Sequence, residues 1–282
     1  MKVGLQLFSI RDSLKKDPYG TLRTVRDLGY RYIEFANHSA LDDPGMGFGL
    51  PVKEMKKVLD DLDIKIAGGH IMPLDPERLD EIIAYHSELG TPRMGYSNGP
   101  LDSYENLVRF CGTINKVGKI FKENGIRLYF HTHYREFLEF NGKLGLQILL
   151  DETDPSLVDF ELDTFWAYRA GVDPIKAMDM LGPRMLLMHQ KDLGKNTKYV
   201  NLFKASPDPF HATQAQMMEY IDDSDFVEIG TGTLPIQAYI DRARSLGVEY
   251  IILEQDQTQL AELESIKLSM EGFKKFSGVE WD

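Results

Sequence analysis

The chain has 282 residues, of which 43% are hydrophobic and 11% aromatic, and its 32 Lys and Arg against 44 Asp and Glu give a formal net charge of −12 at pH 7. That length suits two ordinary domains or one α/β barrel, and no apolar run approaches the ~18 residues of a membrane-spanning helix. The acidic balance disfavours a protein that holds nucleic acid through its phosphates, and the single cysteine, Cys111, excludes an internal disulfide and a cysteine-based zinc site.

Short runs rich in Val, Ile, Leu, Phe and Tyr recur along the chain, each followed by a longer segment with helical spacing. The chain enters the first of these runs directly, without the long apolar core and the small-residue cleavage site of a secretory signal. We therefore expect a cytoplasmic protein without membrane contact. The predicted strands are 3–8, 31–36, 64–69, 92–96, 126–133, 158–163, 184–189 and 249–254. Several helical segments end in a glycine suited to the left-handed conformation of a helix C-terminus, namely Gly29, Gly90, Gly125, Gly182 and Gly247.

Eight alternating βα units in a chain of this length predict one closed (β/α)8 TIM barrel, a single domain over residues 1–282. An open doubly wound sheet is the alternative. It is disfavoured because no G-x-G-x-x-G follows the first strand and no Pro/Gly/Ser linker divides the chain. Two loops interrupt the pattern, a Gly-rich one at 37–50 and a longer one at about 190–225. Long loops at the carboxyl ends of barrel strands act as lids or substrate walls, so we predict a lid-like insertion at 190–225.

Four consecutive predicted strands end in ionisable residues, which are His131, Asp163, His189 and Glu254. The carboxyl ends of barrel strands carry the functional residues of such folds, and these four come from neighbouring strands. Two imidazoles and two carboxylates form a nitrogen and oxygen set suited to Mn²⁺, Co²⁺, Mg²⁺, Fe²⁺ or Zn²⁺. We therefore predict that these four residues hold a divalent metal ion.

Other polar or aromatic residues near the same rim are predicted to contact a substrate. Gln6 and Glu34 lie on the first two strands, where core residues would be expected, and His70 ends the third. Trp166 follows Asp163, and its ring suits either stacking on the apolar face of a sugar or packing at the junction between strand and helix.

The chain as a whole resembles the xylose-isomerase-like barrels of sugar phosphate isomerases and epimerases. The resemblance rests on GLQLFSIRDSL near the start, FHTHYREF at 130–137, ELDTFWAYRAGVDP at 161–174, LLMHQKDL at 186–193, EIGTGTLP at 228–235 and VEYIILEQD at 248–256. It implies metal ligands of type Glu, Asp, His and Glu at the ends of strands five to eight. Asp163, His189 and Glu254 match three of these positions, and His131 stands where many members have Glu.

The strand-5 ligand is left open among three residues. His133 shares the side-chain parity of His131, and Glu136 follows three residues later as a carboxylate. Both are also predicted as substrate contacts. The resemblance further implies that Lys191 reaches substrate oxygens and that Glu254 is the catalytic base.

The resemblance implies a metal-dependent isomerase or epimerase that removes a proton beside a carbonyl through a metal-stabilised enediolate. The F/Y-H-x-H pattern on strand five is similar to inosose dehydratases and keto-sugar lyases or deglycosidases, which makes a dehydratase or lyase the alternative. An apurinic endonuclease, which cuts DNA, is a remote alternative, because such an enzyme needs about nine metal ligands and about five can be placed in this sequence. A barrel that binds sugars without turning them over is a further alternative. The expected partner is a small sugar, keto-sugar or cyclitol; its identity, the metal and any homo-oligomer stay open.

Overall fold

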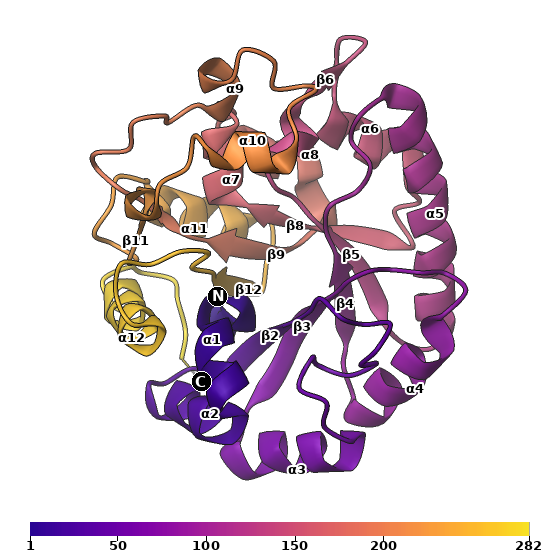
Figure 1. Ribbon diagram of the computed structural model, residues 1–282, viewed down its shortest axis with the longest axis vertical. Coiled ribbons are helices and arrows are strands. Elements are labelled where there is room, and N and C mark those ends of the chain that lie inside the picture. The colour runs from indigo at the N-terminus through magenta and orange to yellow at the C-terminus, as the bar shows by residue number, and fades with distance from the viewer. Residues whose placement is uncertain (282) are drawn as a thin grey trace.

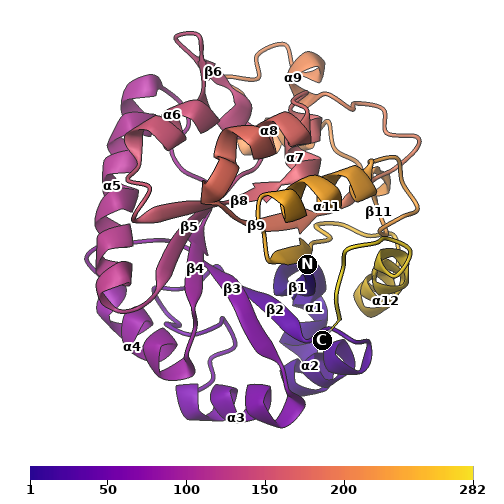
Figure 2. The ribbon, with the colours of Figure 1, turned by 180° about the vertical axis from the view of Figure 1, so that it is seen from behind.

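The protein folds into a closed barrel of eight parallel strands surrounded by helices (Figures 1 and 2). This computed structural model describes residues 1–281, with Gln214 described by its backbone alone. The strands follow the order β1-β12-β9-β8-β5-β4-β3-β2 around the barrel. Their bounds are β1 Lys2–Gln6, β2 Tyr32–Asn37, β3 Lys65–Ile71, β4 Arg93–Tyr96, β5 Arg127–His131, β8 Val158–Asp163, β9 Met185–Gln190 and β12 Tyr250–Leu253. Each overlaps one of the eight predicted strands, so the predicted (β/α)8 TIM barrel is confirmed.

Helices cover the outside of the barrel between successive strands (Figure 1). Their bounds are α1 Arg11–Lys16, α2 Pro18–Asp27, α3 Val52–Leu62, α4 Leu79–Leu89, α5 Tyr104–Glu123, α6 Gly145–Glu152, α7 Thr164–Arg169, α8 Pro174–Leu181, α11 Ile236–Ser245 and α12 Glu262–Phe273. On α5 the buried residues Leu107, Phe110, Ile114, Val117 and Phe121 recur every three or four positions, which turns one apolar stripe toward the strands. Within residues 1–281, no helix is long and apolar enough to cross a membrane.

Short elements lie in the connections between the barrel strands. They are the 3-10 turns η1 Leu7–Ile10, η2 Arg135–Phe137, η3 Gly182–Arg184 and η4 Asp223–Asp225, and the hairpin of β6 Glu139–Phe140 and β7 Lys143–Leu144. The turn η1 continues directly from β1, so the first connection begins without a loop.

The five glycines predicted at helix ends all have positive φ. Gly90, with φ 81° and ψ 29°, has the expected left-handed conformation and ends α4. At Gly182 the prediction is wrong in detail, because ψ is −128° and the residue leads into a 3-10 turn.

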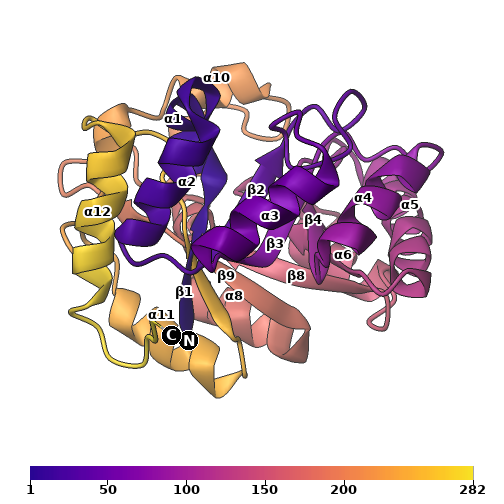
Figure 3. The ribbon, with the colours of Figure 1, turned by 90° about the horizontal axis from the view of Figure 1, so that it is seen from below.

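The long segment after β9 begins and ends in a small antiparallel sheet of β10 (Asp192–Leu193) and β11 (Phe226–Val227). It contains two short helices, α9 (Leu202–Ala205) and α10 (Gln214–Met218). Figure 3 shows α10 on the face of the barrel opposite to the two chain termini. Met218 contributes to the wall of the cavity at that end of the barrel. The predicted lid is therefore placed beside the cavity, and its closure stays a prediction.

The inside of the barrel changes from apolar to polar toward the carboxyl ends of the strands. Its apolar part is formed by Tyr32, Ala67, Tyr129, Leu187, Tyr250 and Ile252. A Cβ atom on Gly95 would lie 2.3 Å from the ring of Tyr129, so this glycine of β4 leaves the space that the ring fills. The hydroxyl of Tyr129 thereby reaches the buried carboxylate of Glu34, where the polar part begins.

Candidate functional site

Four buried side chains meet at the carboxyl ends of β5, β8, β9 and β12. They are His131, Asp163, His189 and Glu254, the residues predicted as metal ligands, and each offers one nitrogen or oxygen within 4.8 Å of the others. We call them the rim quartet. They converge because parallel strands of a barrel all end on the same face.

A buried cation of the chain itself adjoins the rim quartet. Lys191, which follows β9, is fully buried, and its Nζ donates hydrogen bonds to Asp163 Oδ2 at 2.5 Å and to Glu254. Asp256 lies 3.6 Å from the same nitrogen. Burial lowers the pKa of Lys191, but the carboxylates of Asp163, Asp256 and Glu254 more than offset it, so the pKa stands above its usual value. Lys191 is therefore a permanent positive charge at neutral pH.

Asp163 is also fixed from its other side. Its Oδ1 accepts a hydrogen bond from the backbone N–H of Trp166 at 2.9 Å, which makes Asp163 the N-cap of α7. With Oδ2 facing Lys191, both carboxylate oxygens have a partner. The strand-to-helix junction thus holds this carboxylate in one orientation.

A second layer of carboxylates lies beneath the rim quartet and fixes its histidines. Glu161 Oε2 is 2.9 Å from His131 Nδ1 and 2.9 Å from His70 Nε2. Glu34 Oε2 is 2.5 Å from His189 Nε2. Each histidine of the quartet therefore has one ring nitrogen against a buried carboxylate, as the histidines of metal sites do. The other nitrogen of His189, Nδ1, lies 2.9 Å from Glu254 Oε2 within the quartet.

Gln6 and Glu34 lie deeper than the sequence suggested. Both are fully buried, and Gln6 Nε2 donates to Glu34 Oε2 at 2.8 Å. Burial raises the pKa of Glu34, but the charges of His70 and His189 outweigh it and lower the pKa to about 2. Among the described residues, neither side chain lines the cavity at the rim. Glu34 contacts His70, His189 and Tyr129, and Gln6 accepts the backbone N–H of Phe8 at 3.2 Å, so neither faces an open space for substrate.

The three candidates for the strand-5 ligand occupy different places. His131 alone belongs to the rim quartet. His133 lines the cavity; burial lowers its pKa to about 3, so the ring is neutral, and its buried Nδ1 has no hydrogen-bond partner within the described chain. Glu136 is buried outside the cavity and accepts the backbone N–H of His133 at 2.7 Å. Of the three, only His131 thus lies with Asp163, His189 and Glu254, whereas Glu136 bonds the turn after β5; which residue binds a metal stays a prediction.

A cavity of about 250 Å³ opens above the rim quartet. His70, His133 and Trp166, three of the predicted substrate contacts, line it together with His131 and Glu254 of the quartet. The remaining lining residues are Phe8, Arg11, Ala36, His38, Met72, Ser97, Asn98, Tyr134, Arg135, Met218, Phe226, Asp256 and Gln257.

Two acidic residues of this region were missed by the sequence reasoning. Glu161 stands two positions before Asp163 on β8 and therefore faces the same side of the strand, so strand parity gives a signal for it. Asp256 stands two positions after Glu254, beyond the end of β12, where strand parity no longer applies. Burial and the nearby Glu254 raise the pKa of Asp256 to about 7, against the pull of Lys191.

The sequence profile described as Xylose isomerase-like TIM barrel matches residues 22–276. The chain belongs to this family. Among solved structures, it is similar to a sugar phosphate isomerase/epimerase from Parabacteroides distasonis ATCC 8503, with a TM-score of 0.80 and 22% identity over 99% of this chain and 95% of the other. It is also similar to the IOLI protein with a bound zinc atom, with a TM-score of 0.68 and 17% identity over 98% of this chain and 100% of the other. These two likenesses show the fold.

A curated relative extends the comparison to another type of reaction. An inosose dehydratase of Bacillus anthracis (strain CDC 684 / NRRL 3495) is 26% identical over 98 residues, which cover 35% of this chain. The match spans only 32% of that relative's length. The family of this chain thus has neighbours named for isomerase/epimerase and for dehydratase activity.

Proposed function

We propose that the protein is a divalent-metal-dependent enzyme that removes a proton beside the carbonyl of a small sugar, keto-sugar or cyclitol. The observation that carries the proposal is the rim quartet of two imidazoles and two carboxylates, of which His131 and Glu254 line a cavity. Such a donor set suits Mn²⁺, Co²⁺, Mg²⁺, Fe²⁺ or Zn²⁺. The buried carboxylates beside His131 and His189 support it, because such partners hold the orientation of metal-binding imidazoles.

The chemistry divides between the ion and the chain. When bound, a divalent ion supplies a Lewis acid that stabilises negative charge developing on a substrate oxygen. Glu254 stands at the cavity wall as the catalytic base: burial raises its pKa, but Lys191 and His189 outweigh burial and hold the pKa well below the usual range, so it is ionised. Lys191 is the second predicted catalytic residue, and it holds Asp163 and Glu254 in place through hydrogen bonds.

The carboxylates that line the cavity come from one side of the barrel. Glu254 and Asp256 both follow β12, whereas the opposite wall offers the imidazoles of His70 and His133. An isomerase that moves a proton between adjacent carbons on one face of the substrate needs one base, and Glu254 suffices for it. An epimerase that uses two carboxylates on opposite faces is not supported by this arrangement. We therefore place isomerisation by a single base first.

Elimination is the second candidate, and it begins with the same proton abstraction. Asp256 favours it, because a carboxyl with a pKa of about 7 is partly protonated at neutral pH and can donate to a leaving hydroxyl. The partial match to an inosose dehydratase also supports elimination.

Proton exchange in D₂O tests the proposal. Protein stripped with a chelator and reloaded with Mn²⁺ is incubated with a panel of keto-sugars and cyclitols, and the products are analysed by mass spectrometry. We expect metal-dependent uptake of deuterium, and Glu254→Gln should slow it by about 10² to 10⁴-fold. Glu88→Gln, on the exposed side of α4, is the matched control and should exchange normally.

The mass of the product separates the two candidates. Isomerisation leaves the mass unchanged apart from deuterium, whereas elimination removes water or a larger leaving group. Absence of exchange with every compound, or equal exchange with and without metal, would contradict the proposed function.

A further inference from the structure

A second cavity, of about 490 Å³, adjoins the one above the rim quartet. Its volume lies within the range of about 300–1,000 Å³ typical of small-molecule sites. The two cavities share four lining residues, which are Phe8, Arg11, Ala36 and His38. The two cavities therefore adjoin at these four residues, and a substituent on a ligand over the quartet would meet the second cavity there. Nothing in the proton abstraction itself needs this second space.

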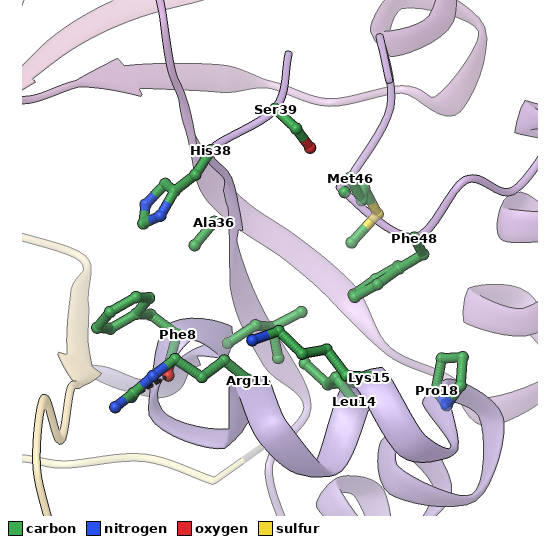
Figure 4. A pocket seen from close by; sticks show the side chains of 12 residues that line it. Phe8, Arg11, Leu14, Lys15, Pro18, Ala36, His38, Ser39, Met46 and Phe48 are labelled. Carbon is green, nitrogen blue, oxygen red and sulfur yellow. Dashed lines mark hydrogen bonds between the residues drawn. The ribbon is translucent and has the colours of Figure 1, made fainter. Parts of the chain in front are cut away.

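The walls of the second cavity are largely apolar and include two aromatic rings. Phe8 of η1 and Phe48 of the Gly-rich loop 37–50 lie on opposite sides of the pocket in Figure 4. Leu14 and Met46, both buried, contribute to the surface between them. Side chains of this kind, facing a cavity from two sides, suit a flat apolar group of aromatic size.

The charged side chains of the cavity are both cations. Arg11 and Lys15 line it, and none of its lining residues is acidic, although the chain as a whole carries a net charge of −12. Figure 4 shows the Lys15 amine between the two phenylalanine rings. The nearest acid is the exposed Asp12, 3.3 Å from that amine. His38 adds no charge at neutral pH, because burial and His70 lower its pKa although Glu254 raises it.

Arg11 is held at the junction of the two cavities. Its Nη1 donates to the carbonyl oxygen of Phe8 at 2.9 Å, and its Cζ lies 4.3 Å from the centre of the Phe8 ring. The guanidinium is thus positioned where a two-part ligand would pass from one cavity to the other.

The loop that forms the far wall is held together by polar contacts within it. Asn37, fully buried at the end of β2, donates through Nδ2 to the carbonyl oxygens of Asp43 at 2.7 Å and Gly45 at 2.8 Å. The carboxylate of Asp43 accepts from the backbone N–H groups of Gly45 and Gly49, each at 2.8 Å. These bonds fix the path of the loop around Met46 and Phe48, so the cavity exists before a ligand arrives.

We propose that the second cavity binds an aromatic group with an acidic substituent, attached to the sugar or cyclitol ring that the proposed function places over the rim quartet. The substrate class is then a glycoside-like or ring-substituted compound, larger than a free monosaccharide. The inference rests on the proposed function for the position of the sugar ring, but the aromatic site itself can be tested without turnover.

Binding of small probes to the intact, chelator-treated protein tests this site. Dissociation constants for benzoate, benzyl alcohol, acetate and inorganic phosphate are measured by ligand-observed NMR at pH 7. We expect benzoate to bind at least about tenfold more tightly than acetate, because only benzoate brings a ring, and more tightly than the neutral benzyl alcohol. Phe48→Ala should weaken benzoate and benzyl alcohol alike. Lys15→Gln should weaken benzoate and leave benzyl alcohol unchanged.

Matched variants locate the effect. Leu268→Ala removes an exposed apolar side chain of α12, and Lys16→Gln removes an exposed charge next to Lys15 that does not line the cavity. Both should bind the probes like the wild type. Equal affinity for benzoate and acetate, or unchanged benzoate binding in Phe48→Ala, would overturn the proposal. Binding of phosphate in place of benzoate would overturn it in favour of a phosphate site.

The two proposals fail in different ways. Probe binding needs neither metal nor turnover, so benzoate binding in a protein without proton exchange would overturn the proposed function and support the aromatic site. Proton exchange without benzoate binding would support the proposed function and overturn the aromatic site.

Discussion

The ammonium of Lys191 lies 2.5 Å from the carboxylate of Asp163, and it also bonds Glu254. Two of the four residues that can hold a divalent ion therefore already share one cation of the chain, which offsets one of their two negative charges. All three groups are almost completely excluded from water. The charge balance at the rim thus depends on Lys191 as well as on any ion.

Replacing Lys191 by Met should make the protein depend on metal for stability. Without the ammonium, Asp163 and Glu254 repel each other in a buried place, so the free energy of unfolding in chelator should fall by about 3–5 kcal/mol. Added Mn²⁺ should stabilise the variant more than the wild type, because the ion replaces the missing charge. Urea unfolding with and without MnCl₂ measures both effects. The exposed Lys195→Met should change stability by less than about 0.5 kcal/mol; an equal response of variant and wild type to Mn²⁺ would refute the idea.

His131 and His133 should differ in their effect on metal content. His131→Ala removes a ring nitrogen from the rim quartet and should lose metal as severely as Asp163→Ala or His189→Ala. His133→Ala should keep the metal, because its ring lines the cavity outside the quartet. Elemental analysis of the purified variants gives the answer. The reverse pattern would move the ligand to His133, and retention in both would point to Glu136 or to a site of three residues.

Glu161→Gln should weaken metal binding although Glu161 is not in the rim quartet. The amide oxygen of Gln carries no negative charge and holds the two imidazoles of His131 and His70 less strongly than the carboxylate does, so the tautomer and orientation of His131 become less fixed. Losses of about 10 to 100-fold in metal affinity are typical for such partners. Titration with Mn²⁺ measures the change. Asp159→Asn is the control on the same strand, since Asp159 pairs with Arg127 at 2.5 Å; an equal effect of both variants would show a general loss of strand stability.

Glu136 should make the protein less stable as the pH rises from about 4.5 to 7. Burial raises its pKa from 4.5 to about 7, so in this interval the folded state keeps a proton that the unfolded state has released. The unfolded state is therefore favoured as the pH increases, by up to about 3 kcal/mol above pH 7.

The variant Glu136→Gln removes this dependence and keeps an oxygen that can accept the N–H of His133. It should be more stable than the wild type at pH 8, and this advantage should shrink at pH 5. Urea unfolding at the two pH values provides the comparison, with Glu139→Gln, exposed on β6, as the control. A difference from wild type that is the same at both pH values would count against the assignment.

The sequence by itself determined the barrel and the positions of the rim residues. Runs of β-branched and aromatic residues alternate with amphipathic segments that end in glycine, and this pattern leaves few topologies. Once the strands are parallel and closed, His131, Asp163, His189 and Glu254 must come to the same face, because each lies within one residue of the end of a strand. Local pattern was enough here, since strand ends are defined by the chain itself.

Only the tertiary structure decided what each polar side chain contacts. β5 ends at His131, and beyond that point the alternation of faces no longer says where His133 and Glu136 point. The sequence predicts Gln6 and Glu34 as substrate contacts, but in the barrel Glu34 lies against His189, and Gln6 bonds Glu34. Lys191 likewise faces Asp163 and Glu254 through a turn after β9. Such contacts join residues far apart in the sequence, and their geometry depends on how the strands pack rather than on the pattern within any one of them.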